Sequence, residues 1–500
     1  MALATETIAS THPDPAHFDV LIVGAGISGI DAAYHLQQEC PAKSFALLEN
    51  QASFGGTWIT HTFPGIRSDS DLYTFGYGWK PWSSAPIATA EEILNYLDEV
   101  LDEQDIRRHI RFRHQVRRAR WSSEERCWTL EVERKDTGET LRFTCSFLWM
   151  CQGYYRHSEG YTPEFPGAER FRGPIVHPQH WPPDLDYEGK RVLVIGSGAT
   201  AATLVPAMAE HTAHVTMLQR SPTYYFAAAN RAEIADMLRS LDVPEEWVHE
   251  ITRRKVLQDQ KTIVHRSFHD SRALREELIA GARAYLGEDF DVETHFTPRY
   301  RPWRQRLAFL PDGDLFRSIR AGKASVVTDR IETFTERGIM LVSGKELAAD
   351  IIVTATGLNI CALGDIAFTI DGQTLDFAEC WGHRGILFTG VPNMAWIFGY
   401  LRASWTLRAD LVAQFVCRLL NHMAAKDAVV VTPQLRPQDQ DMPKRPWIDP
   451  ENFNAGYLMR SMHLLPKQGD REPWIFSQDY QIEKDEIPAA DLEDGTLAYR

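Results

Sequence analysis

The chain has 500 residues, 44% of them apolar and 24% charged, and its net charge is −15. This length exceeds one simple core, so we expect two or three domains in an ordinary globular protein. The acidic balance argues against non-specific nucleic-acid binding and against a polybasic membrane patch, and no run reaches the ~20 apolar residues of a membrane span.

The amino-terminal residues 1–18 contain neither a basic start nor an apolar run. We therefore expect no signal peptide and a cytoplasmic location. The seven cysteines are scattered and form no C-x-x-C pair. Reduced, mostly buried thiols and no metal site are expected, and a disulfide reductase is disfavoured because it needs such a pair.

The first motif in chain order is a complete dinucleotide fingerprint. Residues 18–23 (FDVLIV) predict a buried parallel strand. Gly24, Gly26 and Gly29 follow as G-A-G-I-S-G, then a helical stretch and a second strand that ends in Glu49. The helix end offers N–H groups to a pyrophosphate, and Glu49 can accept a ribose hydroxyl. Because this carboxylate would repel a 2′-phosphate, the site suits FAD or NAD.

A second glycine turn follows further along, in KRVLVIGSGATAATLVPAMAE, with Gly196, Gly198 and Ala201 as G-x-G-x-x-A. Here the next strand ends without an acid, in Gln219, Arg220 and Ser221. A guanidinium can bind a phosphate through two parallel hydrogen bonds. This site therefore favours NADP over NAD, and the alternative is that Arg220 is a solvated surface residue.

A third pattern lies between the two glycine turns. Residues 171–182 read F-x-G-x-x-x-H-x-x-x-W-P, with fixed positions at Phe171, Gly173, His177, Trp181 and Pro182. A segment that joins two nucleotide-binding halves is a place where two redox cofactors can be brought together. The same residues are also typical of a packed linker. We favour the interpretation that His177 and Trp181 anchor an interdomain hinge and take no part in the chemistry.

The second half is interrupted and then resumes. Residues 223–324 are helix-like and charged. They end in a loop rich in prolines, aromatic residues and arginines, namely Arg299, Arg301, Arg304 and Arg306. Residues 349–357 predict a buried strand that returns the chain to the first half. Beyond it, Ser404 or Thr406 is positioned to cap a helix. Residues 441–500 are expected to wrap the surface without contributing chemistry.

Residues 55–69 complete a pattern that belongs to a known family. They read G-G-x-W-x-x-x-x-[FY]-P-G-x-x-x-D, matched by Gly55, Gly56, Trp58, Phe63, Pro64, Gly65 and Asp69. Together with residues 171–182, this motif resembles the flavin-dependent Baeyer–Villiger monooxygenases, which are class B flavoprotein monooxygenases. The resemblance extends over residues 18–480. Segments such as PGIRSDSDLYTFGY and ASWTLRADLV are most similar to the branch that contains the mycobacterial thioamide-prodrug activator.

The fingerprints and the resemblance together predict an α/β fold. It should contain two Rossmann-like dinucleotide-binding domains, one for FAD and one for NADP, with a helical insertion in the NADP domain. We expect the FAD domain at residues 1–157 and 358–500 and the NADP domain at 158–222 and 325–357. The insertion should cover residues 223–324 and end in the arginine-rich loop.

The resemblance also implies roles for single residues. Arg306 would extend over the flavin as a permanent cation beside anionic oxygen, and Asp69 would hold its guanidinium in place. Gln305 stands where many members have a second phosphate-binding lysine, and Arg304 is its candidate replacement. The expected cofactor-binding positions are Gly24, Gly26, Ser28, Gly29, Glu49, Gly56, Thr57, Trp58, Arg67, Ser68, Asp69, Val116, Gly196, Ser197, Gly198, Ala199, Thr200, Ala201, Arg220 and Ser221.

The implied reaction consumes NADPH and O2. Reduced FAD would form a C4a-peroxyflavin, which inserts oxygen into a ketone to give an ester or lactone, or oxidises a sulfide to a sulfoxide. Two alternatives stay open. A heteroatom-only flavin monooxygenase or N-hydroxylase shares the architecture, and a non-catalytic nucleotide-sensing flavoprotein would keep both fingerprints. The expected partner is a small ketone or sulfide; its identity and the oligomeric state have no readable signal.

Overall fold

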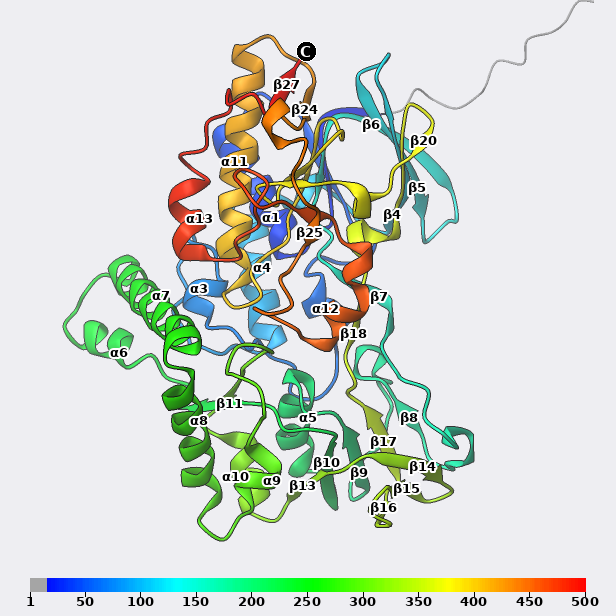
Figure 1. Ribbon diagram of the computed structural model, residues 1–500, viewed down its shortest axis with the longest axis vertical. Helices are drawn as coiled ribbons and strands as arrows, with labels where there is room; N and C mark the ends of the chain where they lie inside the picture. Colours follow the sequence, from blue (N-terminus) through cyan, green and yellow to red (C-terminus); the bar gives the residue numbers. More distant parts are fainter. Residues whose placement is uncertain (1–15) are drawn as a thin grey trace, which may run out of the picture.

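The computed structural model describes residues 16–500, so most of the amino-terminal stretch discussed above lies outside the described residues. The molecule is elongated, and its two main sheets lie toward opposite ends (Figure 1). No helix within residues 16–500 is long and apolar enough to cross a membrane. All seven cysteines are free thiols, and only Cys127 is partly exposed.

The larger sheet has nine strands in the order β20-β19-β4-β5-β6-β1-β2-β3, with β23 beside β6. Its strands are β1 (Ala16–Val23), β2 (Phe45–Leu48), β3 (Ile110–Arg111), β4 (His114–Ser122), β5 (Cys127–Arg134), β6 (Thr140–Met150), β19 (Ala367–Ile370), β20 (Gln373–Thr374) and β23 (Met394–Trp396). β1 is parallel to β2 and β6, whereas β4, β5 and β6 are antiparallel. The apolar run predicted at residues 18–23 is therefore a central strand.

Helices α1 (Ile27–Glu39), α4 (Ala90–Glu103) and α11 (Trp405–Ala425) share one apolar core with this sheet. Shorter helices complete this half: α2 (Thr57–Thr60), α3 (Leu72–Phe75), α12 (Gly456–Ser461) and α13 (Tyr480–Glu486). Within residues 16–500, five two-stranded sheets lie outside the larger sheets, and three of them belong to the carboxyl-terminal part of the chain. Those three are β21 (Gly382–His383) with β22 (Leu387–Phe388), β24 (Val431–Pro433) with β27 (Leu497–Tyr499), and β25 (Arg445–Pro446) with β26 (Lys467–Gln468).

The second sheet is wholly parallel, in the order β13-β10-β9-β17-β8. Its strands are β8 (Ile175–Val176), β9 (Arg191–Ile195), β10 (His214–Gln219), β13 (Ala324–Thr328) and β17 (Ile351–Thr354). Helix α5 (Ala199–Ala209) follows the second glycine turn, and a small antiparallel sheet of β14 (Ile331–Thr335), β15 (Gly338–Leu341) and β16 (Glu346–Ala348) flanks the strands. Residues 349–357 contain the predicted buried strand, since β17 is fully buried.

The expected helical insertion at residues 223–324 also contains strands that the sequence did not predict. It contains helices α6 (Glu233–Ser240), α7 (Glu245–His269), α8 (Ser271–Leu286), α9 (Val292–Phe296) and α10 (Asp314–Arg320), but also strands β11 (Tyr225–Ala228) and β12 (Ala308–Pro311). These two strands lie near opposite ends of the segment in the sequence, and they pair in parallel. Each has only four residues, too few to show a periodic pattern, and only tertiary contact brings them together.

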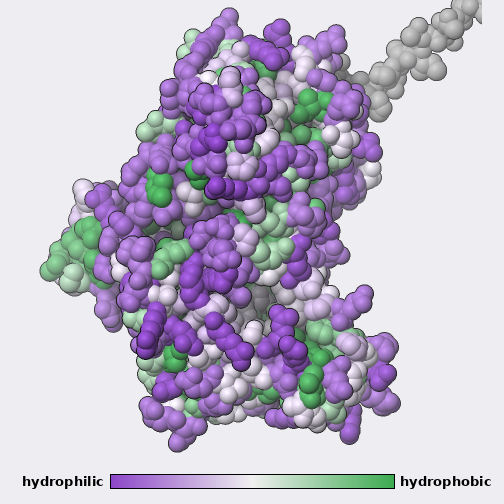
Figure 2. Space-filling view, viewed as in Figure 1, coloured by the Kyte–Doolittle hydropathy of each residue, from purple (hydrophilic) through white to green (hydrophobic). Residues whose placement is uncertain are grey.

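The tip of α6 and α7 projects outward and exposes Met237, Leu241 and Trp247 (Figures 1 and 2).

The two glycine turns are built in the same way. Gly24 and Gly196 each donate their N–H to the end of the neighbouring parallel strand at 2.8 Å, and both have positive φ, 104° and 135°. A Cβ at Gly24 would lie 2.8 Å from the Cys151 carbonyl oxygen, and one at Gly196 would lie 2.2 Å from that of Ala355. Only glycine fits both turns, because each lies directly on the segment that leaves its sheet.

Two antiparallel strands, β7 (Tyr155–Gly160) and β18 (Leu358–Ile360), carry the chain between the halves. His177 touches both crossings. Its Nε2 lies 3.0 Å from the Gly357 carbonyl oxygen, and a Cβ on Gly160 would lie 2.0 Å from its ring. Burial lowers the pKa of His177, although the Gly357 contact opposes this effect. The neutral ring is therefore packed at the junction, as an anchoring role requires.

The other fixed positions of residues 171–182 are packing residues. Phe171 and Trp181 are each 9% exposed and belong to two different apolar clusters of the second half. Gly173 lies so close to the backbone that a Cβ would meet the Asp350 carbonyl oxygen at 2.2 Å. Pro182 accepts the N–H of Leu185. Residues 171–182 thus pack against the second sheet and contact the strands that connect the two halves.

A buried ion pair fixes the start of α11 against the carboxyl-terminal segment. Arg408 is 0% exposed, and its Nε donates to Glu483 at 2.8 Å. Its other N–H groups donate to the carbonyl oxygens of Phe398 and Arg384. Glu483 also accepts the Tyr400 hydroxyl at 2.8 Å. Every donor and acceptor has a partner, which is the condition for a stable buried pair.

We predict that Arg408→Leu lowers the free energy of unfolding by about 3–5 kcal/mol, because it leaves the Glu483 carboxylate buried without its cation. The measurement is the urea midpoint of the flavin-loaded protein. Adding Glu483→Leu should recover part of the loss, since no unpaired charge remains. Arg272→Gln on α8, which removes an exposed pair with Glu276, should leave the midpoint unchanged; an unchanged midpoint for Arg408→Leu would contradict the prediction.

Candidate active site

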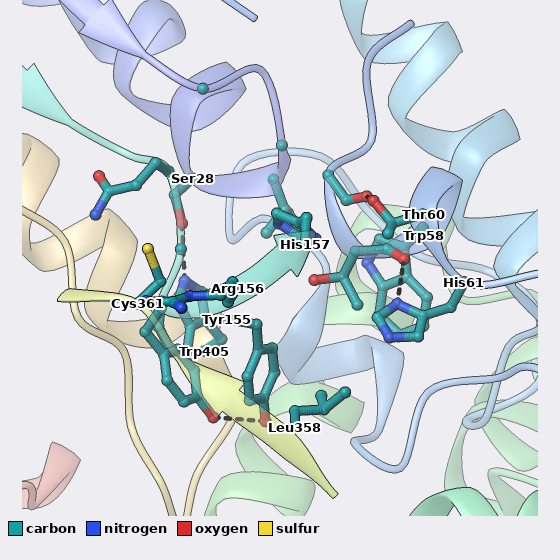
Figure 3. Close-up of a pocket in the computed structure, with 18 of the residues that line it drawn as sticks. Ser28, Trp58, Thr60, His61, Tyr155, Arg156, His157, Leu358, Cys361 and Trp405 are labelled. Atoms are coloured by element: carbon teal, nitrogen blue, oxygen red, sulfur yellow. Dashed lines mark hydrogen bonds between the residues drawn. The ribbon is translucent and has the colours of Figure 1, made fainter. Parts of the chain in front are cut away.

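A cavity of about 700 Å³ lies between the two halves and reaches both glycine turns. Its wall is formed by the loops after β1, β6, β9 and β17, by residues 55–70, and by the arginine-rich loop. Figure 3 shows part of this wall, with Trp58 and His61 on one side and Tyr155 and Trp405 on the other.

The first glycine turn fits a dinucleotide. Helix α1 begins after Gly26 without a side-chain cap, and the N–H groups of Ile27 and Ser28 have no acceptor among the described residues. Glu49 is 5% exposed and accepts the N–H groups of Ala25 and Gln51, each at 2.7 Å. Burial raises the pKa of Glu49, and these bonds act against that rise. A pyrophosphate at the helix end and a ribose hydroxyl at Glu49 match this arrangement.

The second glycine turn has the same free helix end. Helix α5 begins after Gly198 without a side-chain cap. At the end of β10, Gln219 is buried, and its amide donates to the His295 carbonyl oxygen and to Thr328. Arg220 follows as an exposed residue. No ion-pair partner of Arg220 occurs in residues 16–500. Its guanidinium is therefore available at the strand end where the sequence predicts a 2′-phosphate.

The predicted site residues divide into two groups. Those that line the cavity are Gly24, Gly26, Ser28, Glu49, Gly56, Thr57, Trp58, Arg67, Ser68, Asp69, Val116, Gly198, Ala199, Thr200 and Arg306. Those outside its lining are Gly29, Gly196, Ser197, Ala201, Arg220, Ser221 and the fixed positions of residues 171–182. Gly29 serves packing, since a Cβ there would meet the Gly24 carbonyl oxygen at 2.0 Å.

Asp69 and Arg306 form a two-pronged ion pair inside the cavity. Arg306 Nε donates to Asp69 Oδ2 at 2.5 Å, and Nη2 donates to Oδ1 at 2.6 Å. The side chains are 34% and 24% exposed, toward the cavity that both line. Burial works against both charges, but the pairing dominates: the pKa of Arg306 rises well above its ordinary value, and that of Asp69 falls. The pair is charged over the working pH range.

Two other arginines and two histidines of the cavity lining do not supply a free positive charge beside Arg306. Arg67 is bound to Asp314 at 2.6 Å, and Arg156 is bound to Asp365 at 2.9 Å. Burial lowers the pKa of His157 to about 4 and also lowers that of His61. Both imidazoles are therefore neutral at pH 7, so they add no positive charge beside the ion pair.

A chain of aromatic contacts, not predicted from the sequence, leads from the first glycine turn into the cavity that holds the ion pair. Trp405 Nε1 donates to Ser28 Oγ at 2.8 Å, and its ring stacks on Tyr154 with 5.1 Å between centroids. Tyr154 donates to the Tyr155 hydroxyl at 2.8 Å (Figure 3). Tyr155 lines the cavity, and its own proton has no acceptor in residues 16–500. The aromatic pair directly after β6 was the signal available in the sequence.

The carboxyl-terminal segment contributes to the cavity, contrary to expectation. Tyr457 of α12 lines it, and the Tyr457 hydroxyl has no partner within the described residues. Trp447 and Trp474, expected near the surface, are each 0% exposed. Nothing in the local sequence signals this placement. It arises because α12 packs against β18 at the chain crossing.

Two further expectations are changed by the structure. Ser404 is the residue before α11, but its side chain makes no capping bond and instead contacts Thr74 at 2.7 Å. Thr406 donates to backbone carbonyl oxygens at Thr74 and Phe75, so both residues tie α11 to α3. Arg304 is paired with Glu451 at 3.0 Å, while Gln305 lines the cavity. The guanidinium of Arg304 is thus directed to the carboxyl-terminal segment.

Comparison with known families agrees with this geometry. The profile described as flavin-binding monooxygenase-like matches residues 86–239, and an NAD(P)-binding Rossmann-like domain matches residues 22–97. Among solved structures, an oxidized steroid monooxygenase bound to NADP is similar with a TM-score of 0.74 at 24% identity, over 97% of this chain and 99% of that one. A complex of OTEMO with FAD and NADP also reaches 0.74, at 19% identity, over 98% and 100%. These two structures establish the fold.

Relatives at higher identity establish the family. The FAD-containing monooxygenase EthA of Mycobacterium tuberculosis is 48% identical over 97% of this chain and 98% of its own length. The putative FAD-containing monooxygenase MymA of the same species is 44% identical over 97% of each chain. The probable FAD-binding monooxygenase AlmA of Acinetobacter baylyi is 43% identical over 97% and 96%. With this identity over almost the full length, the chain belongs to the family of FAD-containing monooxygenases.

Proposed function

We propose that this protein is an NADPH- and O2-dependent monooxygenase that converts ketones into esters or lactones and oxidises sulfides to sulfoxides. The observation that carries the proposal is the Asp69–Arg306 ion pair. It lies in one cavity with both glycine turns. The pair is the fixed charge that such a reaction needs where its two nucleotide cofactors meet.

The cofactors divide between the two halves. FAD would be held by the free end of α1, by Glu49 and by residues 55–69, and NADP by the free end of α5 and Arg220. The sheet topology supports a division into an FAD domain at 1–157 and 358–500 and an NADP domain at 158–222 and 325–357. The segment at 223–324 would close the cavity through Arg306.

When bound, the flavin supplies the electrons and the activated oxygen. The protein supplies charge, orientation and shelter from water. Arg306 provides a cation that cannot lose its proton, beside the place where negative charge develops on oxygen. Asp69 holds both edges of the guanidinium, so the cation needs no rearrangement during the reaction. The Tyr155 hydroxyl accepts from Tyr154 and lines the cavity, so its own proton is available to a bound group.

The reaction class is tested with purified protein, NADPH and a panel of simple ketones and sulfides, with products identified by mass. We expect ester or lactone and sulfoxide formation, each with one oxygen atom from labelled O2. Sulfoxide without any ester would favour a heteroatom-only monooxygenase. A yellow protein that NADPH bleaches and that yields only hydrogen peroxide would contradict the proposal and favour a nucleotide-sensing flavoprotein.

Removal of the cavity cation should separate reduction from oxygenation. For Arg306→Ala we expect ester formation to fall by about 10²-fold or more, because an electrostatic contact to developing charge is lost. Anaerobic flavin reduction by NADPH, followed by absorbance, should change far less. Arg306→Lys should give an intermediate rate, since it keeps the charge but loses the two-pronged contact with Asp69. Undiminished ester formation in Arg306→Ala would remove Arg306 from the mechanism.

Arg220 should determine the choice between the two nicotinamide cofactors. We expect Arg220→Ala to raise KM for NADPH by about tenfold or more while KM for NADH changes little, because only NADPH carries the 2′-phosphate. Steady-state oxidation of each cofactor measures this ratio. Arg254→Ala, on the exposed side of α7, is the matched control and should leave the ratio unchanged. An equal effect on both cofactors would show that Arg220 does not bind the phosphate.

A further inference from the structure

A second cavity, of about 380 Å³, lies behind the wall of the first. The two cavities share the segment that leads into α11. Tyr400 and Ala403 line the large cavity, whereas Leu401 and Arg402 line the smaller one. None of the residues assigned above to FAD, NADP or the ion pair lines the smaller cavity.

Its wall is amphipathic. The apolar part consists of Leu401, Ile448, Phe453, Ile475 and Phe476. The cations of the lining are Arg402 and Arg445, and its carboxylate is Asp449. Asp449 is already engaged, because it accepts the N–H of Glu451 at 2.9 Å and the Asn452 amide at 3.0 Å. An apolar wall with a few convergent polar groups is typical of a small-molecule site.

Arg402 is the unusual member of this wall. No residue within 16–500 accepts a hydrogen bond from its guanidinium or forms an ion pair with it. Its Nη1 is shielded from solvent and has no partner. The residue as a whole is partly exposed, whereas Arg408, which is fully buried, is paired with a carboxylate and with carbonyl oxygens. The shielded Nη1 of Arg402 is therefore a buried donor that lacks an acceptor.

A second guanidinium adds to this excess of positive charge. Arg301 and Arg402 both lie over the ring of Phe268, with Cζ atoms 4.1 Å and 5.0 Å from its centroid. Arg301 is bound to the carbonyl oxygen of Asn452 at 3.1 Å, so its position is fixed. Burial, and then the charge of Arg301, lowers the pKa of Arg402, and the carboxylates of Asp479 and Asp449 oppose this effect only in part. A bound anion on Arg402 would favour its charged form further.

The neutral polar groups around the cavity do not compete for a ligand. Gln468 accepts the Phe476 N–H at 3.0 Å and donates to the Pro446 carbonyl oxygen at 3.0 Å. Gln478 accepts the Leu401 N–H at 2.9 Å and donates to the Gly399 carbonyl oxygen at 3.0 Å. These bonds hold the walls in place. Within residues 16–500, Nη1 of Arg402 is then the side-chain polar atom of this lining that is buried without a partner.

We propose that the smaller cavity binds a carboxylate that carries an apolar chain, with the carboxylate on Arg402 and the chain along the apolar wall. A guanidinium matches a carboxylate through two parallel hydrogen bonds. The side chains of Ile448, Phe453 and Ile475 form an apolar wall on which an alkyl chain can be buried. An inorganic anion has no apolar surface and would gain nothing from this wall. The site adjoins the segment 400–403, so its ligand lies next to the large cavity but outside it.

The test measures binding of octanoate to the flavin-loaded protein by calorimetry, with octan-1-ol and inorganic phosphate as the two comparison probes. We expect saturable binding of octanoate, at least tenfold weaker binding of octan-1-ol, and no competition by phosphate. Because no turnover is involved, the result is independent of the proposed monooxygenase reaction. Phosphate that binds Arg402 as well as octanoate does would overturn the proposal and leave a simple anion site.

Variants locate the site. Arg402→Leu should weaken octanoate binding at least tenfold, and Arg402→Lys should weaken it less, since it keeps the charge. Arg306→Leu and the exposed control Arg254→Gln should leave binding unchanged. Retained flavin and an unchanged melting temperature will show that Arg402→Leu is folded. If Arg402→Leu does not fold, octanoate binding by Arg402→Lys is compared with that of the unmodified protein instead. Binding that depends on Arg306 and ignores Arg402 would assign octanoate to the large cavity and contradict the inference.

Discussion

One packing constraint, met twice, determines where the cofactors can lie. Each glycine turn rests directly on the backbone that leaves its own sheet, Gly24 on Cys151 and Gly196 on Ala355. The absence of a Cβ lets the turn, the helix end and the leaving segment meet at one point. Since the leaving segments are also the crossings between the halves, the two turns face a common space. The large cavity is the consequence of this arrangement.

The ion pair depends on that arrangement. Asp69 belongs to the loop that follows the first fingerprint, and Arg306 belongs to the arginine-rich loop of the long segment inserted into the second half. Their contact joins residues 237 positions apart. Both side chains keep part of their surface toward the cavity. Burial penalises each charge alone, and the pairing outweighs that penalty, so the pKa of Asp69 falls and that of Arg306 rises. The same residues thus connect the halves and supply the charge proposed for the reaction.

The segment 400–403 connects three parts of the molecule. Tyr400 is bound to Glu483, which is held by Arg408, and Trp405 reaches Ser28 at the first glycine turn. Its outer residues, Tyr400 and Ala403, face the large cavity, and the two between them face the smaller one. A ligand in the smaller cavity would therefore contact the same short stretch of backbone that forms a wall of the large one. The buried Arg408 network holds Tyr400, one residue of that wall, through Glu483.

The sequence by itself determined the features that depend on local spacing. The apolar runs and glycines at 18–29 and 191–201 are strand, turn and helix, and the missing acid after β10 is a real difference between the two turns. These predictions succeed because a glycine turn and a buried strand leave a signature within a few residues. The family resemblance, and not local spacing, implied the pairing of Asp69 with Arg306, and the two side chains are in contact in the structure.

Only the tertiary structure decided the rest. Strands β11 and β12 pair although most of the insertion separates them in the sequence. Tyr457 reaches the cavity from a segment that appeared to be surface, and Ser404 and Thr406 bind α3 instead of capping α11. The unpaired state of Arg402 is likewise invisible in the sequence. Each of these depends on which distant residues come together, and no local pattern of residue types encodes such contacts.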